Sequence, residues 1–258
     1  MNCEFESQTT NHEPRISNLN KNKSMKIFKK VSNYLNQKQI NQNSELEWAH
    51  IYHDSIRGKK WLEDLPLNIG RWAGNYTFFY VLNRILSDHK PKSIVELGLG
   101  ESSKFISTFL DNYLHESNHL IIEHDQEWIN HFSSNFDLSD RSIIKRYDLS
   151  EIQVNGKLTK AYKELIFDQD FDLYLIDGPF GNRYYSRYNI VQIANDFNPQ
   201  HDFIIVFDDV HRKGDLQSFE ELKNRLQEKG FKIHSKIYSG NKDVGVLATD
   251  KYRFVSSL

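Results

Sequence analysis

Short apolar runs alternate with amphipathic segments from about residue 93 to the end of the chain. The runs are continuously apolar, which is typical of strands that are buried on both faces of a sheet. They lie at 93–97, 119–123, 142–146, 172–176 and 203–207. The segments between them carry apolar residues at helical spacing and predict helices at 102–114, 126–134, 186–196 and 215–229.

The end of the chain has a different pattern. Two further strands are predicted at 231–238 and 243–249, and the short loop between them indicates a closing antiparallel hairpin. The stretch from 147 to 171 is less regular, and we expect one helix near 157–166. Taken together, the elements predict an α/β protein with a Rossmann-like, doubly wound, mainly parallel seven-stranded sheet and an N-terminal extension.

The first 90 residues differ from the rest in composition. Residues 1–45 are rich in Asn, Lys, Gln and Ser, and we expect a mobile polar arm with at most one short helix. Residues 46–90 are predicted to form a helical cover, with helices at 48–62 and after Gly74-Asn75. Residues 91–258 are predicted to form the domain that contains the sheet.

Composition narrows the classes of function. The formal net charge of −2 over 258 residues predicts no general affinity for nucleic acid or for an anionic membrane. A single cysteine, Cys3, excludes an internal disulfide and a cysteine metal cluster. Without a long apolar stretch or a signal-peptide pattern, we expect no membrane insertion and a cytoplasmic location. Whether the chain forms a homo-oligomer is left open.

The most informative local signal follows the first predicted strand, where Glu96 precedes Gly98 and Gly100. Two close glycines between a strand and a helix that begins near Ser102 let the backbone approach a nucleotide-like ligand. A carboxylate two residues before the first glycine would repel a pyrophosphate and attract an ammonium or a sulfonium group. The turn therefore favours S-adenosylmethionine over NAD as the cofactor.

An acidic residue lies at or just beyond the end of each predicted parallel strand. These residues are Glu96, Glu123, Asp148, Asp177, and the pair Asp208 and Asp209. Glu123 follows Gly100 by roughly the spacing at which an acid accepts ribose hydroxyls in dinucleotide folds. Asp148 could accept a hydrogen bond from an adenine amino group, or it could only cap a turn.

The last three of these aspartates suggest a cation site. Asp177, Asp208 and Asp209 offer oxygen ligands from adjacent strand ends, which suits Mg²⁺ or another divalent cation. Such an ion could lower the pKa of a substrate hydroxyl and position it for methyl transfer. The same residues could equally form a turn and a helix entry, and His211 is either a general base or a loop histidine.

Beyond the fourth parallel strand lies a basic and aromatic segment. Arg183, Tyr184 and Arg187 are candidates to line the pocket of a small-molecule or saccharide acceptor, such as a sugar or an acid. The alternative is that they lie on the solvated start of a helix.

In this order, the motifs resemble those of class I S-adenosylmethionine-dependent methyltransferases over about residues 75–250. The Asp177-Gly178 and Asp208-Asp209 pairs look most like metal-dependent O-methyltransferases of the macrocin type, which act on a sugar hydroxyl, and also like the catechol type. The resemblance implies that Glu96, Gly98 and Gly100 hold the methionine part of the cofactor, that Glu123 holds the ribose, and that the three aspartates bind the metal. It departs at Phe180, where the catechol type has a lysine base, and at Asp209, where it has an asparagine.

Two other functions stay open at this point. An NAD-dependent oxidoreductase would explain the glycines and Glu123, but not Glu96 or the acidic strand ends. A non-catalytic, methyltransferase-like interaction domain would use the polar N-terminal arm to bind a partner.

Overall fold

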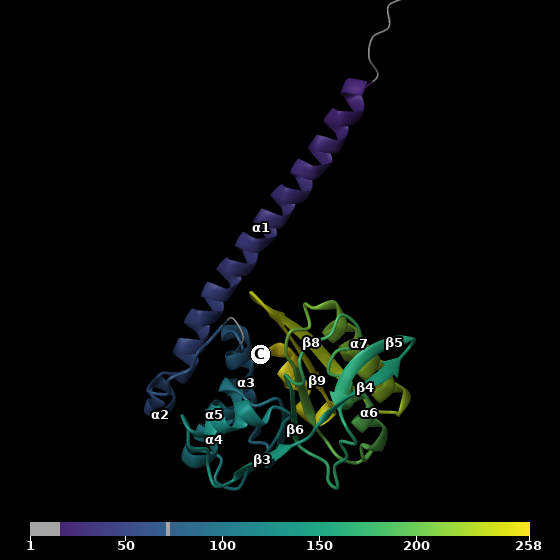
Figure 1. The fold of residues 1–258 in the computed structure, drawn as a ribbon. Coiled ribbons are helices and arrows are strands. Elements are labelled where there is room, and N and C mark those ends of the chain that lie inside the picture. Colours follow the sequence, from purple (N-terminus) through teal and green to yellow (C-terminus); the bar gives the residue numbers. More distant parts are fainter. Residues whose placement is uncertain (1–15, 71–72) are drawn as a thin grey trace, which may run out of the picture. The chain divides into compact units, whose positions relative to one another are not determined.

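The computed structural model describes residues 16–70 and 73–258, with only the backbone for residues 16–28. The chain separates into two units at residues 40 and 41, and each is considered by itself. The helix α1 (Ile16–Ile56) belongs in part to each unit (Figure 1). Cys3 and the first 15 residues of the predicted arm lie outside the described residues.

The second unit contains a seven-stranded sheet in the order β3-β2-β1-β6-β7-β9-β8. β1, β2, β3, β6 and β7 pair in parallel, whereas β9 pairs antiparallel with both β7 and β8. The strands are β1 (Ser93–Leu97), β2 (Asn118–Glu123), β3 (Ser142–Arg146), β6 (Leu173–Ile176), β7 (Ile204–Phe207), β8 (His234–Ser239) and β9 (Asp243–Ala248). The predicted Rossmann-like fold with its closing antiparallel hairpin is confirmed.

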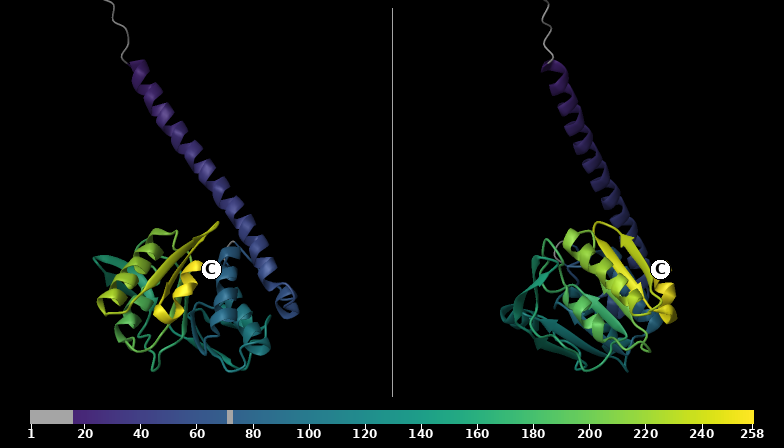
Figure 2. Two further views of the ribbon diagram at one scale, coloured as in Figure 1. Left: turned by 180° about the vertical axis from the view of Figure 1, so that it is seen from behind. Right: turned by 90° about the vertical axis from the view of Figure 1, so that its right-hand side faces the viewer.

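Helices cover both faces of this sheet (Figure 2). On one face α3, α4 and the 3₁₀ helix η2 pack against Ile94 and alternate residues of the neighbouring strands. On the other face α6 and α7 pack against Val95, Leu97 and their neighbours. Besides α1, the helices are α2 (Lys60–Glu63), α3 (Tyr76–His89), α4 (Glu101–Asn112), α5 (Gln126–Ser133), α6 (Asn189–Ile193), η1 (Ala194–Asp196), α7 (Lys213–Glu228) and η2 (Asp250–Ser257).

The prediction of a helix near 157–166 is wrong. This stretch is instead an antiparallel hairpin of β4 (Leu149–Val154) and β5 (Lys157–Tyr162), which forms a separate two-stranded sheet. Asn155 and Gly156 make its two-residue turn, and both have positive φ angles, of 48° and 73°. Asn-Gly is the strongest short-range hairpin signal. The local sequence therefore specified this hairpin, although apolar spacing alone did not indicate it.

The N-terminal region is also more helical than its composition suggested. Instead of a short helix within 1–45 and another at 48–62, α1 has 41 residues and is followed by the short α2. No glycine or proline occurs from Arg15 to Arg57 to interrupt it, and its lysines and glutamines favour helix. None of the helices in the described part of the chain is long and apolar enough to cross a membrane.

Candidate active site

The order of the strands reverses between β1 and β6. The backbone segments that follow these two strands lie close together beyond their carboxyl ends. Asp177 donates its backbone N–H to the carbonyl of Leu97 at 2.9 Å. Gly98 has φ of +108°, and a Cβ atom there would lie 3.0 Å from the nitrogen of Gly178. Only glycine fits this position without strain. In open α/β sheets the crevice at this reversal is where ligands bind.

A pocket of about 410 Å³ opens at this point. Its walls include four carboxylates and four aromatic or imidazole rings, together with the turn after β1. These residues are Glu123, Asp125, Asp177, Asp209, His124, Trp128, Tyr162, Phe180, Gly98 and Leu99. Arg187 and Arg212 complete the basic side of the wall. The pocket therefore combines flat apolar surfaces with an excess of acidic groups.

Glu96 lies beneath the glycine turn and not on the pocket wall. Its side chain is fully buried, accepts hydrogen bonds from Ser102 and Ser103, and lies 3.1 Å from Nε2 of His119. Side chains alternate between faces along a strand. Glu96 therefore shares the face of Ile94, which α4 covers. This geometry favours a supporting role, in which Glu96 holds the first turn of α4, over direct contact with a ligand.

Glu123 is held by the backbone around it. One carboxylate oxygen accepts from the N–H of Leu99 at 3.0 Å, and the other accepts from the N–H groups of His124 and Asp125 at 2.6 and 2.9 Å. A carboxylate has about four lone-pair sites, so it can still accept from a ligand hydroxyl. Glu123 is thus oriented at the end of β2 and lines the pocket, as a ribose-binding acid must.

A buried arginine lies at the centre of the predicted aspartate cluster. The guanidinium of Arg187 donates to the carboxylates of Asp177 at 2.8 Å and Asp209 at 3.2 Å, and to the carbonyl oxygen of Asp208 at 2.8 Å. Its Nε lies 3.4 Å from Asp215, which is also fully buried. Sequence analysis assigned Arg187 to the acceptor and missed Asp215. In the structure Arg187 lines the pocket, and its guanidinium contacts the carboxylates of three aspartates and the backbone of a fourth.

Of these acids, Asp208 has the carboxylate with the fewest polar contacts. Neither of its carboxylate oxygens has a hydrogen-bond partner within the described part of the chain. Burial, with the neighbouring carboxylates of Asp177 and Asp209, raises the pKa of Asp208. Oxygens of the three aspartates lie within 4.8 Å of one another. A buried carboxylate needs a cation or a proton, so these three residues fit a hard divalent ion by donor type and spacing.

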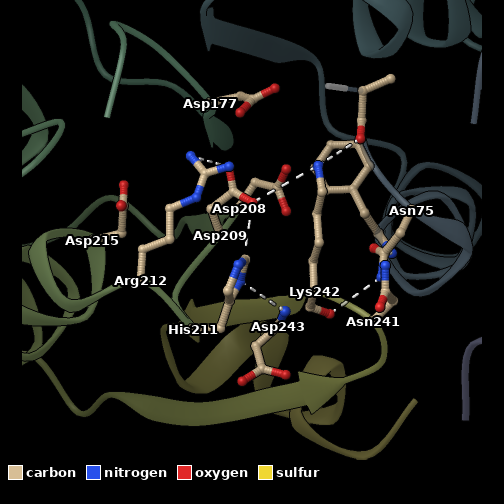
Figure 3. Close-up of polar contacts among 12 residues, drawn as sticks. Asn75, Asp177, Asp208, Asp209, His211, Arg212, Asp215, Asn241, Lys242 and Asp243 are labelled. Carbon is tan, nitrogen blue, oxygen red and sulfur yellow. Dashed lines mark hydrogen bonds and ion pairs between the residues drawn. The ribbon is translucent and has the colours of Figure 1, made fainter. Parts of the chain in front are cut away.

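A second cation approaches the cluster from the β8–β9 turn. Lys242 is buried, donates to the carbonyl of Ala73 at 2.8 Å, and places its Nζ 3.8 Å from Asp209 (Figure 3). Asn75 Nδ2, near the same segment, donates to the carbonyl of Lys242 at 3.2 Å. Sequence analysis missed Lys242, because nothing in a polar turn sequence shows that it folds back over the strand ends.

His211 lies at the edge of the cluster. Its Nδ1 is 4.0 Å from Asp209 and 3.4 Å from the backbone nitrogen of Asp243 (Figure 3). Burial lowers the pKa of His211, which favours the neutral form of its ring. A neutral imidazole can accept a proton.

Five other predicted residues lie away from the pocket wall. Asp148 is exposed and pairs with Arg146 at 2.5 Å, and Ser102 is engaged by Glu96. Arg183 and Tyr184 lie farther along the loop that follows β6. Gly100 is not on the wall either, but an added Cβ there would meet no atom within 4 Å.

The chain was also compared with known proteins. No family model and no curated protein matches it. Among solved structures it resembles a putative O-methyltransferase from Klebsiella pneumoniae, with 14% identity, 85% of this chain and 96% of that chain covered, and a TM-score of 0.42. It also resembles an O-methyltransferase from Bacillus cereus in complex with SAH, with 9% identity, 83% of this chain and 100% of that chain covered, and a TM-score of 0.45. A third similar structure is an SAH-bound methyltransferase from Podospora anserina, with 13% identity, 87% of this chain and 96% of that chain covered, and a TM-score of 0.42. At these identities the likeness concerns the fold alone.

Proposed function

We propose that this protein transfers a methyl group from S-adenosylmethionine to a hydroxyl group of a sugar or another small molecule. The observation that carries the proposal is the acid-lined pocket at the strand-order reversal, where Glu123, Asp177 and Asp209 meet the Gly98 turn. Carboxylates at this position disfavour a pyrophosphate and favour a cofactor that carries positive charge.

The cofactor is proposed to lie along the carboxyl ends of β1 and β2. Glu123 accepts hydrogen bonds from the ribose, and the rings of Trp128 and Phe180 offer flat surfaces for the adenine. The open space at Gly100 leaves room for close approach of the methionine part. Glu96 contributes by holding the turn from below, and the contact of Asp148 with the adenine stays a prediction.

The acceptor hydroxyl is proposed to lie beside Asp177. This side chain is 27% exposed, whereas that of Asp209 is 4% exposed, so Asp177 is the carboxylate of the cluster that can reach a bound molecule. Burial raises the pKa of Asp177, which makes it a better proton acceptor than an exposed aspartate. His211, close to Asp209, is the second candidate for this proton.

Asp177, Asp208 and Asp209 are proposed to hold a divalent cation such as Mg²⁺. When bound, such an ion would lower the pKa of an acceptor hydroxyl. The residues of the chain orient the two reactants and keep water from the site, which is most of what a direct displacement requires. Arg187 keeps the carboxylates together whether or not the ion is present.

Calorimetric titration with S-adenosylmethionine and with NAD tests the proposal. We expect micromolar binding of the first and none of the second; the reverse result would favour the oxidoreductase. Mass spectrometry of an acceptor panel should then reveal a product heavier by one CH₂ group. Cofactor binding without any product, together with a stable protein partner, would favour the non-catalytic interaction domain.

A further inference from the structure

Three cations surround one aromatic ring just beyond the candidate site. The side chains of Lys157, Arg183 and Lys213 lie 5.3, 5.4 and 4.6 Å from the ring centre of Tyr184. We refer to these four residues as the Tyr184 cluster. Its members come from three separate elements, namely the start of β5, the loop after β6 and the start of α7. The fold therefore brings together charges that are far apart in sequence.

Within the described residues, the positive charges of the Tyr184 cluster have no ion-pair partner. The ion pairs of the described residues include none with Lys157, Arg183 or Lys213. All three side chains belong to exposed residues, while the ring of Tyr184 is half-buried between them. The ring face attracts each cation, but it does not neutralise their mutual repulsion. An anion is the ligand that this arrangement would favour.

The Tyr184 cluster lies outside the candidate pocket, but two segments of chain lead from the pocket wall to it. Gly181 and Arg212 both line the pocket. Gly181 precedes Tyr184 by three residues, and Arg212 directly precedes Lys213. Three residues of chain span at most about 11 Å. The two segments are also joined, because Ser186 donates its N–H to the carbonyl of Gly214 at 3.1 Å. A small molecule held at Asp177 could therefore extend to Tyr184.

We infer that the Tyr184 cluster binds an anionic group of the acceptor, so that the substrate carries a carboxylate, sulfate or phosphate in addition to its methylated hydroxyl. This inference rests on the proposed function, which supplies the methyl donor and the reacting hydroxyl. The acidic pocket then receives the positive cofactor, while the basic cluster receives the negative acceptor. The two ligands are thus distinguished by their opposite charges.

The test uses the full chain and simple anions as probes. Inorganic phosphate, sulfate and acetate are titrated by calorimetry at constant ionic strength, and the three arms show which anion is preferred. The variant Lys157→Gln/Arg183→Gln/Lys213→Gln is compared with a control, Lys90→Gln/Lys92→Gln/Lys236→Gln, which removes the same charge from other exposed sites. In the control, Lys90 lies 4.9 Å from the ring centre of Tyr113, so this variant also loses one contact between a cation and a tyrosine ring.

We expect at least one anion to bind, with affinity reduced at least tenfold in the cluster variant and unchanged in the control. In methyl transfer, the cluster variant should raise KM for the acceptor more than it lowers kcat. No binding of any anion, equal binding by both variants, or an unchanged acceptor KM would overturn the inference.

The affinity for S-adenosylmethionine is measured in parallel and should not change in the cluster variant. A loss of cofactor affinity there would place the cluster in the cofactor site and overturn the acceptor assignment. Failure of the wild-type protein to bind S-adenosylmethionine would instead refute the proposed function, so the two failures are distinguishable.

Discussion

Replacing Arg187 with methionine tests whether the guanidinium holds the aspartate cluster together. The side chain of Arg187 is 3% exposed and lies within 3.4 Å of Asp177, Asp209 and Asp215. Methionine has a similar length and keeps the apolar part of the packing, but it leaves these carboxylates without their main cation. Arg187 has φ of 57°, a strained value that either residue adopts at similar cost, so the comparison isolates the charge.

The expected loss in the free energy of unfolding is about 3–5 kcal/mol near neutral pH, the range found when one partner of a buried ion pair is removed. A matched control is Arg225→Met on α7, whose ion pair with Glu221 at 2.9 Å is partly exposed. That change should cost about 1 kcal/mol or less. Urea unfolding followed by tryptophan fluorescence measures both, with EDTA present so that no divalent ion compensates.

The pH dependence of this loss has a definite sign. Burial already raises the pKa of Asp177 and Asp215 above the ordinary value of 3.8, and removal of Arg187 raises both further. A group with a raised folded pKa binds its proton more tightly in the folded protein, so stability falls as the pH rises from that ordinary value through the raised one. The deficit of Arg187→Met should therefore be smaller near about pH 5.5 than near about pH 8. A loss below about 1 kcal/mol, or one independent of pH, would refute this account of the cluster.

Three further predictions concern the site. Gly98→Val should lower the free energy of unfolding by about 2 kcal/mol and abolish S-adenosylmethionine binding, because its Cβ would meet the backbone of Gly178 at 3.0 Å. Gly100→Ala should fold with unchanged stability, because an added Cβ there meets no atom. If calorimetry showed equal losses of stability for the two variants, this distinction between the glycines would be wrong. Asp208→Asn, or excess EDTA, should lower kcat about a hundredfold or more while cofactor affinity stays the same. Full activity in EDTA would discard the metal but leave methyl transfer in place. Lys242→Met, which removes the contacts with Ala73 and Asp209, should lower kcat more than cofactor affinity; equal effects on both in steady-state kinetics and titration would argue for a purely structural role.

Much of the architecture follows from local sequence. The apolar runs at 172–176 and 203–207 lie within one residue of β6 and β7, whose residues are all buried, because a strand that is covered on both faces must be largely apolar. Asn155-Gly156 specifies the β4–β5 turn, and its prediction required only attention to turn residues. The acids that follow the strands, such as Glu123 and Asp177, could also be listed in advance, since parallel strands end at one edge of the sheet.

Which way these groups face, and what lies against them, was decided by tertiary structure. Glu96 and Glu123 both end strands, but the face on which Glu96 lies is covered by α4, so only Glu123 lines the pocket. Arg187 and Lys242 reach the carboxylate of Asp209 from loops that are separated by more than fifty residues in sequence. Such a cluster depends on how loops pack across the sheet, and a buried charge is stable only once that packing brings its partners together.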